Sequence, residues 1–267
     1  MPRVSIGRYF AADSPVHRLD PRVKLIATLA YMVSCLFVHS AATLALAAAT
    51  AAVAVRLSRV PARLLLAQLK PLALFLIATS AINLFFARTG TVLLALGPLQ
   101  VHMGGLSAAI LYTGRFFLLL VSGSLLMLTT TATALTDAAG KLLAPLERWG
   151  APVNQVALIF SIALRFVPVL AQETDNIVAA QTARGAHLEG KSALAYARAY
   201  VPLAVPLFAS ALRHAENLGR AMDARCYTGI GRTHYHVMRL EPRRDGIAIA
   251  ALLLYLAALT MLAVASL

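Results

Sequence analysis

The stretch "GIAIAALLLYLAALTMLAVA" occupies residues 246–265 and contains no charged side chain. An uninterrupted apolar run of about 20 residues is long enough to cross roughly 30 Å of bilayer hydrocarbon as an α-helix. The sequence therefore predicts a membrane-spanning helix at this position, and that prediction sets the class of the whole fold.

The composition agrees with a membrane protein. The 267-residue chain is 60% hydrophobic and only 13% charged, whereas soluble proteins carry about 25% charged residues. Its net charge of +13 would suggest a nucleic-acid partner in a soluble protein. Here the basic residues stand mainly beside the apolar runs, so membrane topology explains them better. We expect the lipid bilayer, and no nucleic acid, as a partner.

Four more apolar runs precede the last one, at 23–39, 41–57, 71–87 and 105–130. Together they predict an all-α polytopic protein with about five transmembrane helices. Lys and Arg are frequent before the first run and between the second and third, but the link between the first and second has none. Because cytoplasmic loops are enriched in these residues, we expect a multi-pass cell-membrane protein with a cytoplasmic N-terminus.

The chain is expected to have three parts: residues 1–130 with the first four spans, 131–244, and a last span in 245–267. The middle part has 13 Lys and Arg between 132 and 244, which favours a cytoplasmic location. Its apolar residues recur at helical spacing, and this pattern predicts three amphipathic helices near 132–148, 154–184 and 192–226. Two stretches, 156–171 and 199–212, are apolar enough to compete as spans, but internal prolines and one arginine argue against crossing.

Two of these helices run into similar tripeptides, Ala183-Arg184-Gly185 and Ala224-Arg225-Cys226. In both copies an asparagine stands eight residues before the arginine and an alanine four residues before it. We interpret each as an arginine at a helix end, where small neighbours let a partner's carboxylate come close enough for bidentate pairing. The alternative is a pair of solvated arginines that merely interact with the helix dipoles.

Other motifs give weaker signals. Gly185, Gly190, Lys191 and Ser192 match the P-loop pattern, but a P-loop must follow a buried strand and the preceding residues are helical in composition. Arg115 interrupts the fourth apolar run; we expect it to pair inside the bundle or to snorkel, although a functional role stays open. His234 and His236 lack a third ligand. No catalytic residue, metal site or cofactor is expected, and the chain is not expected to be an enzyme.

Three segments carry a resemblance to a known family: "GRYFAADSPVHRLDPRVKL" (7–25), "SIALRFVPVLAQETDNIVAAQTARG" (161–185) and "YVPLAVPLFASALRHAENLGRAMDARCYTG" (200–229). They closely resemble the T component of energy-coupling-factor (ECF) transporters. The resemblance implies a membrane scaffold that joins two cytoplasmic ATPase subunits to a membrane S component, which captures a vitamin or a metal ion. ATP would then be hydrolysed by the partners.

The resemblance also implies a partner-binding site. Arg184 and Arg225 match the family's paired arginines, which dock into the two ATPases at the ends of coupling helices, and Ala183, Gly185 and Ala224 match their neighbours. Cys226 stands where the family has glycine, so it carries a cost if that position needs a positive φ. The likeness favours a T component shared among several S components. A dedicated biotin or cobalt/nickel system, and less so a self-contained secondary transporter, remain alternatives.

Overall fold

The computed structural model describes residues 9–86, 91–96, 99–185, 193–229 and 240–265. The described chain is mainly α-helical, as predicted, and forms two compact units. The bundle unit comprises Gly7–Leu142 and Met238–Leu267, and the hairpin unit contains Leu143–Val237.

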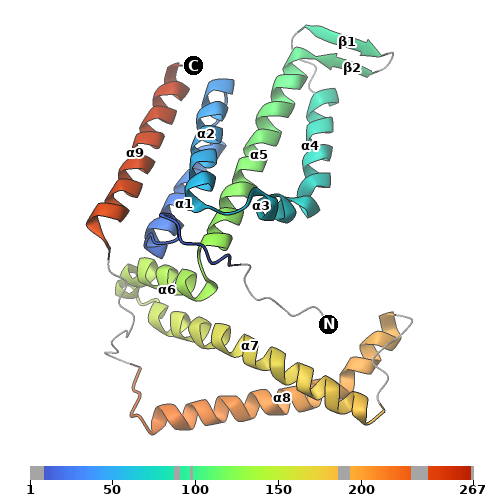
Figure 1. Ribbon diagram of the computed structural model, residues 1–267, viewed down its shortest axis with the longest axis vertical. Helices are drawn as coiled ribbons and strands as arrows, with labels where there is room; N and C mark the ends of the chain where they lie inside the picture. Colours follow the sequence, from blue (N-terminus) through green and yellow to red (C-terminus); the bar gives the residue numbers. More distant parts are fainter. Residues whose placement is uncertain (1–8, 87–90, 97–98, 186–192, 230–239, 266–267) are drawn as a thin grey trace. The chain divides into compact units, whose positions relative to one another are not determined.

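The bundle unit is organised around one long central helix (Figure 1). This helix, α5, packs against α1, α2, α3 and α4, and α9 packs against α1 and α2. The bounds of the elements are α1 (Pro21–Leu36), α2 (Ala41–Ser58), α3 (Ala62–Leu69), η1 (Lys70–Leu72), α4 (Ala73–Phe86), α5 (Met103–Thr129), α6 (Ala132–Leu143) and α9 (Pro242–Ala265).

The core of the bundle unit lies where α1, α2, α5 and α9 meet. Its buried cluster includes Cys35, Ala47, Leu118 and Leu259. Polar groups here pair inside the bundle: the Tyr31 hydroxyl donates to the Ala47 carbonyl oxygen at 2.8 Å. Such internal pairing is required where no water can reach a polar group.

Five described helical segments are long and apolar enough to cross a membrane: Ala41–Ser58, Ala62–Phe86, Met103–Thr129, Val153–Ala183 and Pro242–Ala265. The number of candidate spans agrees with the predicted number, but one predicted span is replaced by a different segment. α1, at 16 residues, is about 24 Å long at 1.5 Å per residue and falls short of the required length. Val153–Ala183, predicted to be an amphipathic helix, qualifies instead.

A two-stranded antiparallel hairpin connects α4 to α5, in the region predicted only as a loop. Its strands are β1 (Val92–Leu96) and β2 (Leu99–His102), and their register pairs Leu96 with Leu99. The segment is apolar on both sides of Gly97-Pro98, and this pattern of strand, turn dipeptide and strand was the signal available in the sequence.

Candidate partner-binding site

The hairpin unit contains two 31-residue helices, α7 (Val153–Ala183) and α8 (Ala193–Asp223), preceded by the short helix η2 (Ala144–Trp149). α7 and α8 run in opposite directions (Figure 1). Their bounds agree closely with the predicted helices 154–184 and 192–226. The C-termini of the two helices, which carry the two arginine tripeptides, therefore lie at opposite ends of the pair.

Helix α7 ends at the first tripeptide because its backbone turns into the left-handed region there. Arg184 is the C-cap, and its amide donates to the carbonyl oxygens of Ala180 at 3.2 Å and Gln181 at 3.1 Å. Gly185 follows with φ 86°, and its amide donates to the Thr182 carbonyl oxygen at 3.0 Å. Glycine is the residue that adopts this conformation without steric cost.

Helix α8 ends in the same way at the second tripeptide. The Cys226 amide donates to the Asp223 carbonyl oxygen at 2.9 Å and the Tyr227 amide to that of Met222 at 3.0 Å. These two bonds form a Schellman motif, whose left-handed residue is Cys226 with φ 53°. The position does need a positive φ, so the cysteine there carries backbone strain that Gly185 avoids.

Both tripeptides are open to solvent. All six residues, Ala183, Arg184, Gly185, Ala224, Arg225 and Cys226, are exposed. Within the described part of the chain neither arginine forms a salt bridge, whereas nearby Arg220 pairs with Glu216 at 3.2 Å. Each guanidinium group is therefore available to an acceptor on another molecule.

Side-chain contacts near the middle of α7 and α8 hold the pair together. Ser210 Oγ donates to Glu173 Oε1 at 3.0 Å, and the rings of Phe166 and His214 have centroids 5.9 Å apart. On α7, Glu173 and Phe166 lie 11 and 18 residues before Arg184. On α8, Ser210 and His214 lie 15 and 11 residues before Arg225. At a rise of about 1.5 Å per residue in opposite directions, the two arginines stand on the order of 40 Å apart.

The hairpin unit also exposes apolar side chains from the predicted stripes. Ile159 and Phe160 of α7 are 64% and 56% exposed, and Phe208 of α8 is 67% exposed. Exposed apolar surface of this extent marks contact with a partner or with lipid.

The P-loop interpretation finds no support in the backbone. The residues that lead into Gly185 belong to α7, whereas a phosphate-binding loop follows a β-strand. Gly190, Lys191 and Ser192 lie outside the described residues, as do His234 and His236. Among the described residues no group of three or more His, Cys, Asp or Glu is arranged to hold a metal ion.

Arg115 pairs inside the bundle unit, which is one of the two outcomes expected from the sequence. Its Nη2 donates to the Val38 carbonyl oxygen, and its guanidinium carbon lies 5.3 Å from the centroid of the Tyr112 ring. The guanidinium thus holds the turn between α1 and α2 against α5.

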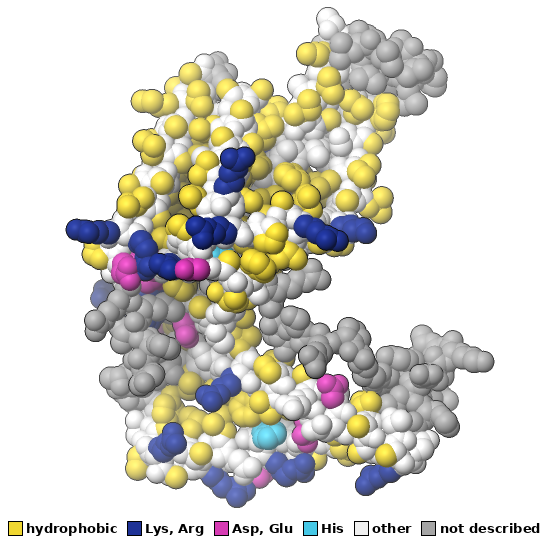
Figure 2. Space-filling view, in the orientation of Figure 1, with side chains coloured by type: hydrophobic (Ala, Val, Ile, Leu, Met, Phe, Trp, Pro, Cys, Tyr) yellow, Lys and Arg dark blue, Asp and Glu magenta, His cyan; other side chains and the backbone are white. Residues whose placement is uncertain are grey.

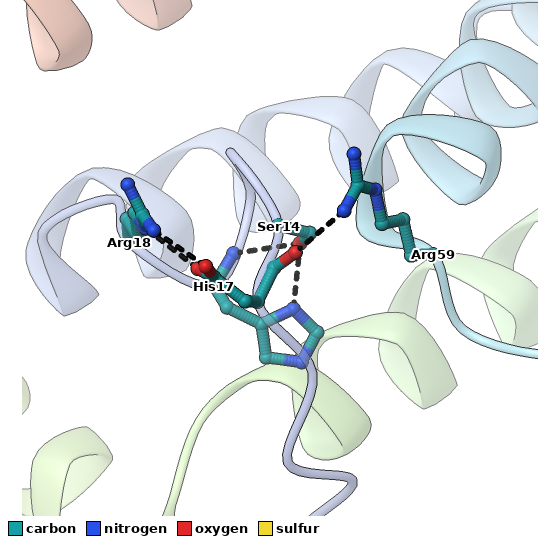
Figure 3. Close-up of polar contacts among 5 residues, drawn as sticks. Ser14, His17, Arg18 and Arg59 are labelled. Atoms are coloured by element: carbon teal, nitrogen blue, oxygen red, sulfur yellow. Dashed lines mark hydrogen bonds and ion pairs between the residues drawn. The ribbon is translucent and has the colours of Figure 1, made fainter.

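A second polar cluster, in the turn before α1, was not identified from the sequence (Figure 3). Arg18 donates to both carboxylate oxygens of Asp13 at 2.7 and 2.5 Å, and this hydrogen bonding lowers the pKa of Asp13. Arg59, which caps α2 with φ 54°, donates to the Asp13 carbonyl oxygen at 3.2 Å. The turn is thereby attached to the end of α2.

The histidine of this turn is held from both ring nitrogens. His17 Nδ1 lies 2.7 Å from Ser14 Oγ, and Nε2 lies 2.9 Å from the Phe10 carbonyl oxygen. Because a carbonyl oxygen can only accept, the neutral ring carries its proton on Nε2 and accepts from the Ser14 hydroxyl. Burial lowers the pKa of His17, which favours this neutral form. The sequence contained one signal of a turn at this position: the dipeptide Asp20-Pro21 is typical of a helix start.

Comparisons with known proteins give concordant matches. The family model described as "CbiQ: Cobalt transport protein" matches residues 12–236. The energy-coupling factor transporter transmembrane protein EcfT of Ruminiclostridium cellulolyticum is 39% identical over 88% of this chain and 88% of its own length. EcfT of Bacillus subtilis is 38% identical over 97% of this chain and 100% of its own length. A relative in Bifidobacterium longum, named as an ABC transporter ATP-binding protein, is 42% identical over 94% of this chain, which spans only 32% of that longer protein.

Proposed function

The chain belongs to the CbiQ family and is similar over most of its length to EcfT transmembrane components of energy-coupling factor transporters, and we propose that it couples ATP hydrolysis by two cytoplasmic ATPase subunits to solute uptake. In this proposal the chain itself hydrolyses nothing. A membrane S component binds the vitamin or metal ion, and the chain joins that S component to the ATPases.

The observation that carries the proposal is the pair of equivalent helix ends. Arg184 and Arg225 each follow the last turn of a long helix, each precedes a left-handed residue, and both are exposed. A separation on the order of 40 Å, worked from the helical rise, suits two anchors on two different subunits. Each guanidinium would insert into a groove on one ATPase and donate to carboxylate or carbonyl oxygens there.

The Bifidobacterium longum relative supports an ATPase as the neighbour. A region similar to almost the whole of this chain occupies about a third of that polypeptide, whose name describes an ATP-binding protein. A partner that is covalently linked in one organism is a reasonable candidate for a non-covalent partner in another.

The mechanism we infer is mechanical. When the two ATPases close on ATP, they draw the ends of α7 and α8 toward each other. The contacts between Glu173 and Ser210 and between Phe166 and His214 make the two helices pivot about a common point. The exposed apolar faces, with Phe160 and Phe208 among them, carry the displacement to the S component, which reorients and releases its cargo inside.

This mechanism needs both arginine ends on the cytoplasmic side, so α7 belongs with the cytoplasmic coupling helices despite its length. Arg165, Glu173 and Asp175 within α7 would be costly in hydrocarbon. On the face of the bundle unit in Figure 2, Lys and Arg side chains gather along one edge of the hydrophobic surface, as expected for a cytoplasmic boundary.

Thiol labelling tests this topology. We expect the exposed Cys226 to react from the cytoplasmic side and the buried Cys35 to stay unreactive. Cysteines introduced at positions 95 and 267 should be labelled from outside. External labelling of a cysteine introduced at position 190 would contradict the cytoplasmic platform.

The proposal has two versions, which differ in the cargo that is imported. The EcfT relatives, similar over nearly their whole length, favour a T component shared among several S components. The description of the family model as a cobalt transport protein favours a dedicated metal system. Purification of the tagged chain from its own organism tests both versions: we expect two ATPase subunits at stoichiometric yield, with several S components in the first version and one in the second. A chain that transports solute without any ATPase would be a secondary transporter instead.

A further inference from the structure

Two of the chain passages between the units flank the coupling helices α7 and α8. The chain leaves the bundle unit after α6 and returns to it before α9. A displacement of α7 and α8 that travels along these two passages therefore enters the bundle unit through α6, and hence the end of α5, and through the start of α9. Buried charged side chains lie at both of these entrances.

At the first entrance, Lys24 of α1 holds the end of α5. The Lys24 side chain is buried, with 7% exposure, and its Nζ donates to the carbonyl oxygens of His17 at 2.9 Å and Thr129 at 3.0 Å. Thr129 is the last residue of α5, and α6 begins at Ala132. The carbonyl groups at a helix C-terminus lack intrahelical partners and carry partial negative charge, so a buried ammonium group stabilises the end of α5.

At the second entrance, Asp245 holds the start of α9. This carboxylate is buried, with 3% exposure, and accepts from the backbone amides of Asp20 at 3.1 Å and Glu241 at 2.7 Å. Asp20 is in turn the N-cap of α1 and accepts from the Arg22 amide at 2.9 Å. The first turn of α1 is thus bonded to the start of α9 as well as to the end of α5.

The segment before α1 strengthens the first attachment. The Phe10 amide donates to the Leu128 carbonyl oxygen at 3.0 Å, next to the Thr129 carbonyl that Lys24 uses. Asp20 and Arg22 also act electrostatically on the Lys141 ammonium group of α6. The same short region of sequence therefore reaches α5, α6 and α9.

We propose that Lys24, Asp20 and Asp245 form a polar clasp that fixes both chain entrances to α1, so that displacement of the coupling helices reaches the S component instead of being absorbed by the bundle unit. The clasp rests on the proposed function, since it matters for activity only if the hairpin unit transmits movement. Its members are positioning residues: they touch neither nucleotide nor cargo, and they act through the helix ends that they hold.

The test compares Lys24→Met with Lys70→Met in the full transporter, reconstituted in liposomes with its ATPases and S component. Both changes remove one ammonium group, but Lys70 is exposed on η1 and serves as the matched control. For Lys24→Met we expect the ATPases to stay bound, ATP hydrolysis to continue, and uptake per ATP hydrolysed to fall at least fivefold. Lys70→Met should keep the wild-type ratio. A structural defect alone would lower uptake and hydrolysis together and leave their ratio unchanged.

An unchanged ratio in Lys24→Met would overturn the clasp. If that variant does not assemble, Asp245→Asn decides the matter, because asparagine keeps one acceptor oxygen but places an NH₂ group against the other backbone amide. The same fall in uptake per ATP is expected, and a wild-type ratio would overturn the proposal. Failure of the wild-type chain to bind ATPases at all would refute the proposed function instead, so the two failures are distinguishable.

Discussion

Replacing both Arg184 and Arg225 by alanine is expected to release the ATPases while leaving the chain folded. Both side chains are exposed and neither forms an ion pair within the described residues. The cost to the fold is therefore limited to the interaction with the helix dipole, about 0.3–1 kcal/mol for each arginine.

The cost to the interface is larger. Truncating one partner of a buried, hydrogen-bonded charge pair weakens binding by about 2–5 kcal/mol, which corresponds to roughly 30-fold to several thousand-fold in Kd. Because the two ends are far apart and share no contact, their effects should add. Each single variant should weaken coupling, and the double variant should lose both anchors. Arg→Lys should rescue poorly, because an ammonium group cannot reproduce the planar fork of a guanidinium.

The assay measures ATPase retained by the tagged chain in detergent and ATP-driven uptake in liposomes. Arg220→Ala is the matched control, since it removes an exposed arginine of α8 whose salt bridge among the described residues is to Glu216 at 3.2 Å, and it should behave as wild type. Cargo binding to the S component should be unchanged in every variant. If the Arg184→Ala, Arg225→Ala double variant kept its ATPases and imported at the wild-type rate, the anchor hypothesis would be refuted.

Three further predictions concern single residues. Cys226→Gly should raise the free energy of unfolding by about 1 kcal/mol, because glycine adopts φ 53° without strain; an unchanged or lower value in chemical denaturation would contradict this. Lys191→Ala should leave ATP hydrolysis and uptake near wild type, and loss of hydrolysis in an intact complex would restore the nucleotide-site interpretation. Burial lowers the pKa of His17 below 6.5 in the folded chain. The unfolded chain therefore binds the proton first, and stability should fall as the pH drops below about 6.5. His17→Gln should make the thermal stability less dependent on pH between pH 7 and pH 5, and an equal pH dependence in both proteins would count against the buried neutral ring.

Periodicity and charge were enough to predict most of the fold. The runs 41–57 and 246–265 correspond to α2 and α9 because long apolar segments have few alternatives to a helix. The sequence could not show that α1 ends at Leu36, since Phe37 and Val38 directly after it are also apolar. Composition alone gave conflicting signals for α7: the helix is long and apolar enough to cross a membrane, whereas Arg165, Glu173 and Asp175 within it argue against crossing.

For the candidate site, the sequence predicted helix ends at the two tripeptides but not the backbone conformation there, and partner binding by these residues stays a prediction. The repeated tripeptide located Arg184 and Arg225 at helix ends, and the structure has both helices ending there. Whether position 226 needs a positive φ was open, because a cysteine has no preference for the left-handed region and gives no signal of it. The long-range partners of Lys24 and Asp245 could not be predicted either, since Thr129 and Asp20 lie 105 and 225 residues away from them and no local pattern encodes such pairs.

The opposite directions of α7 and α8 have a consequence for symmetry. Two antiparallel helices that cross near the middle are related by an approximate twofold axis through the crossing, and that axis exchanges one arginine end for the other. If the proposed function holds, a single polypeptide would thus present similar surfaces to the two halves of an ATPase dimer without forming a dimer itself. The two ends differ in several side chains, and one difference falls on the left-handed residue: Gly185 has no side chain where Cys226 carries a thiol. Two identical ATPases would meet slightly different ends, and two different ATPases could each be assigned to its own.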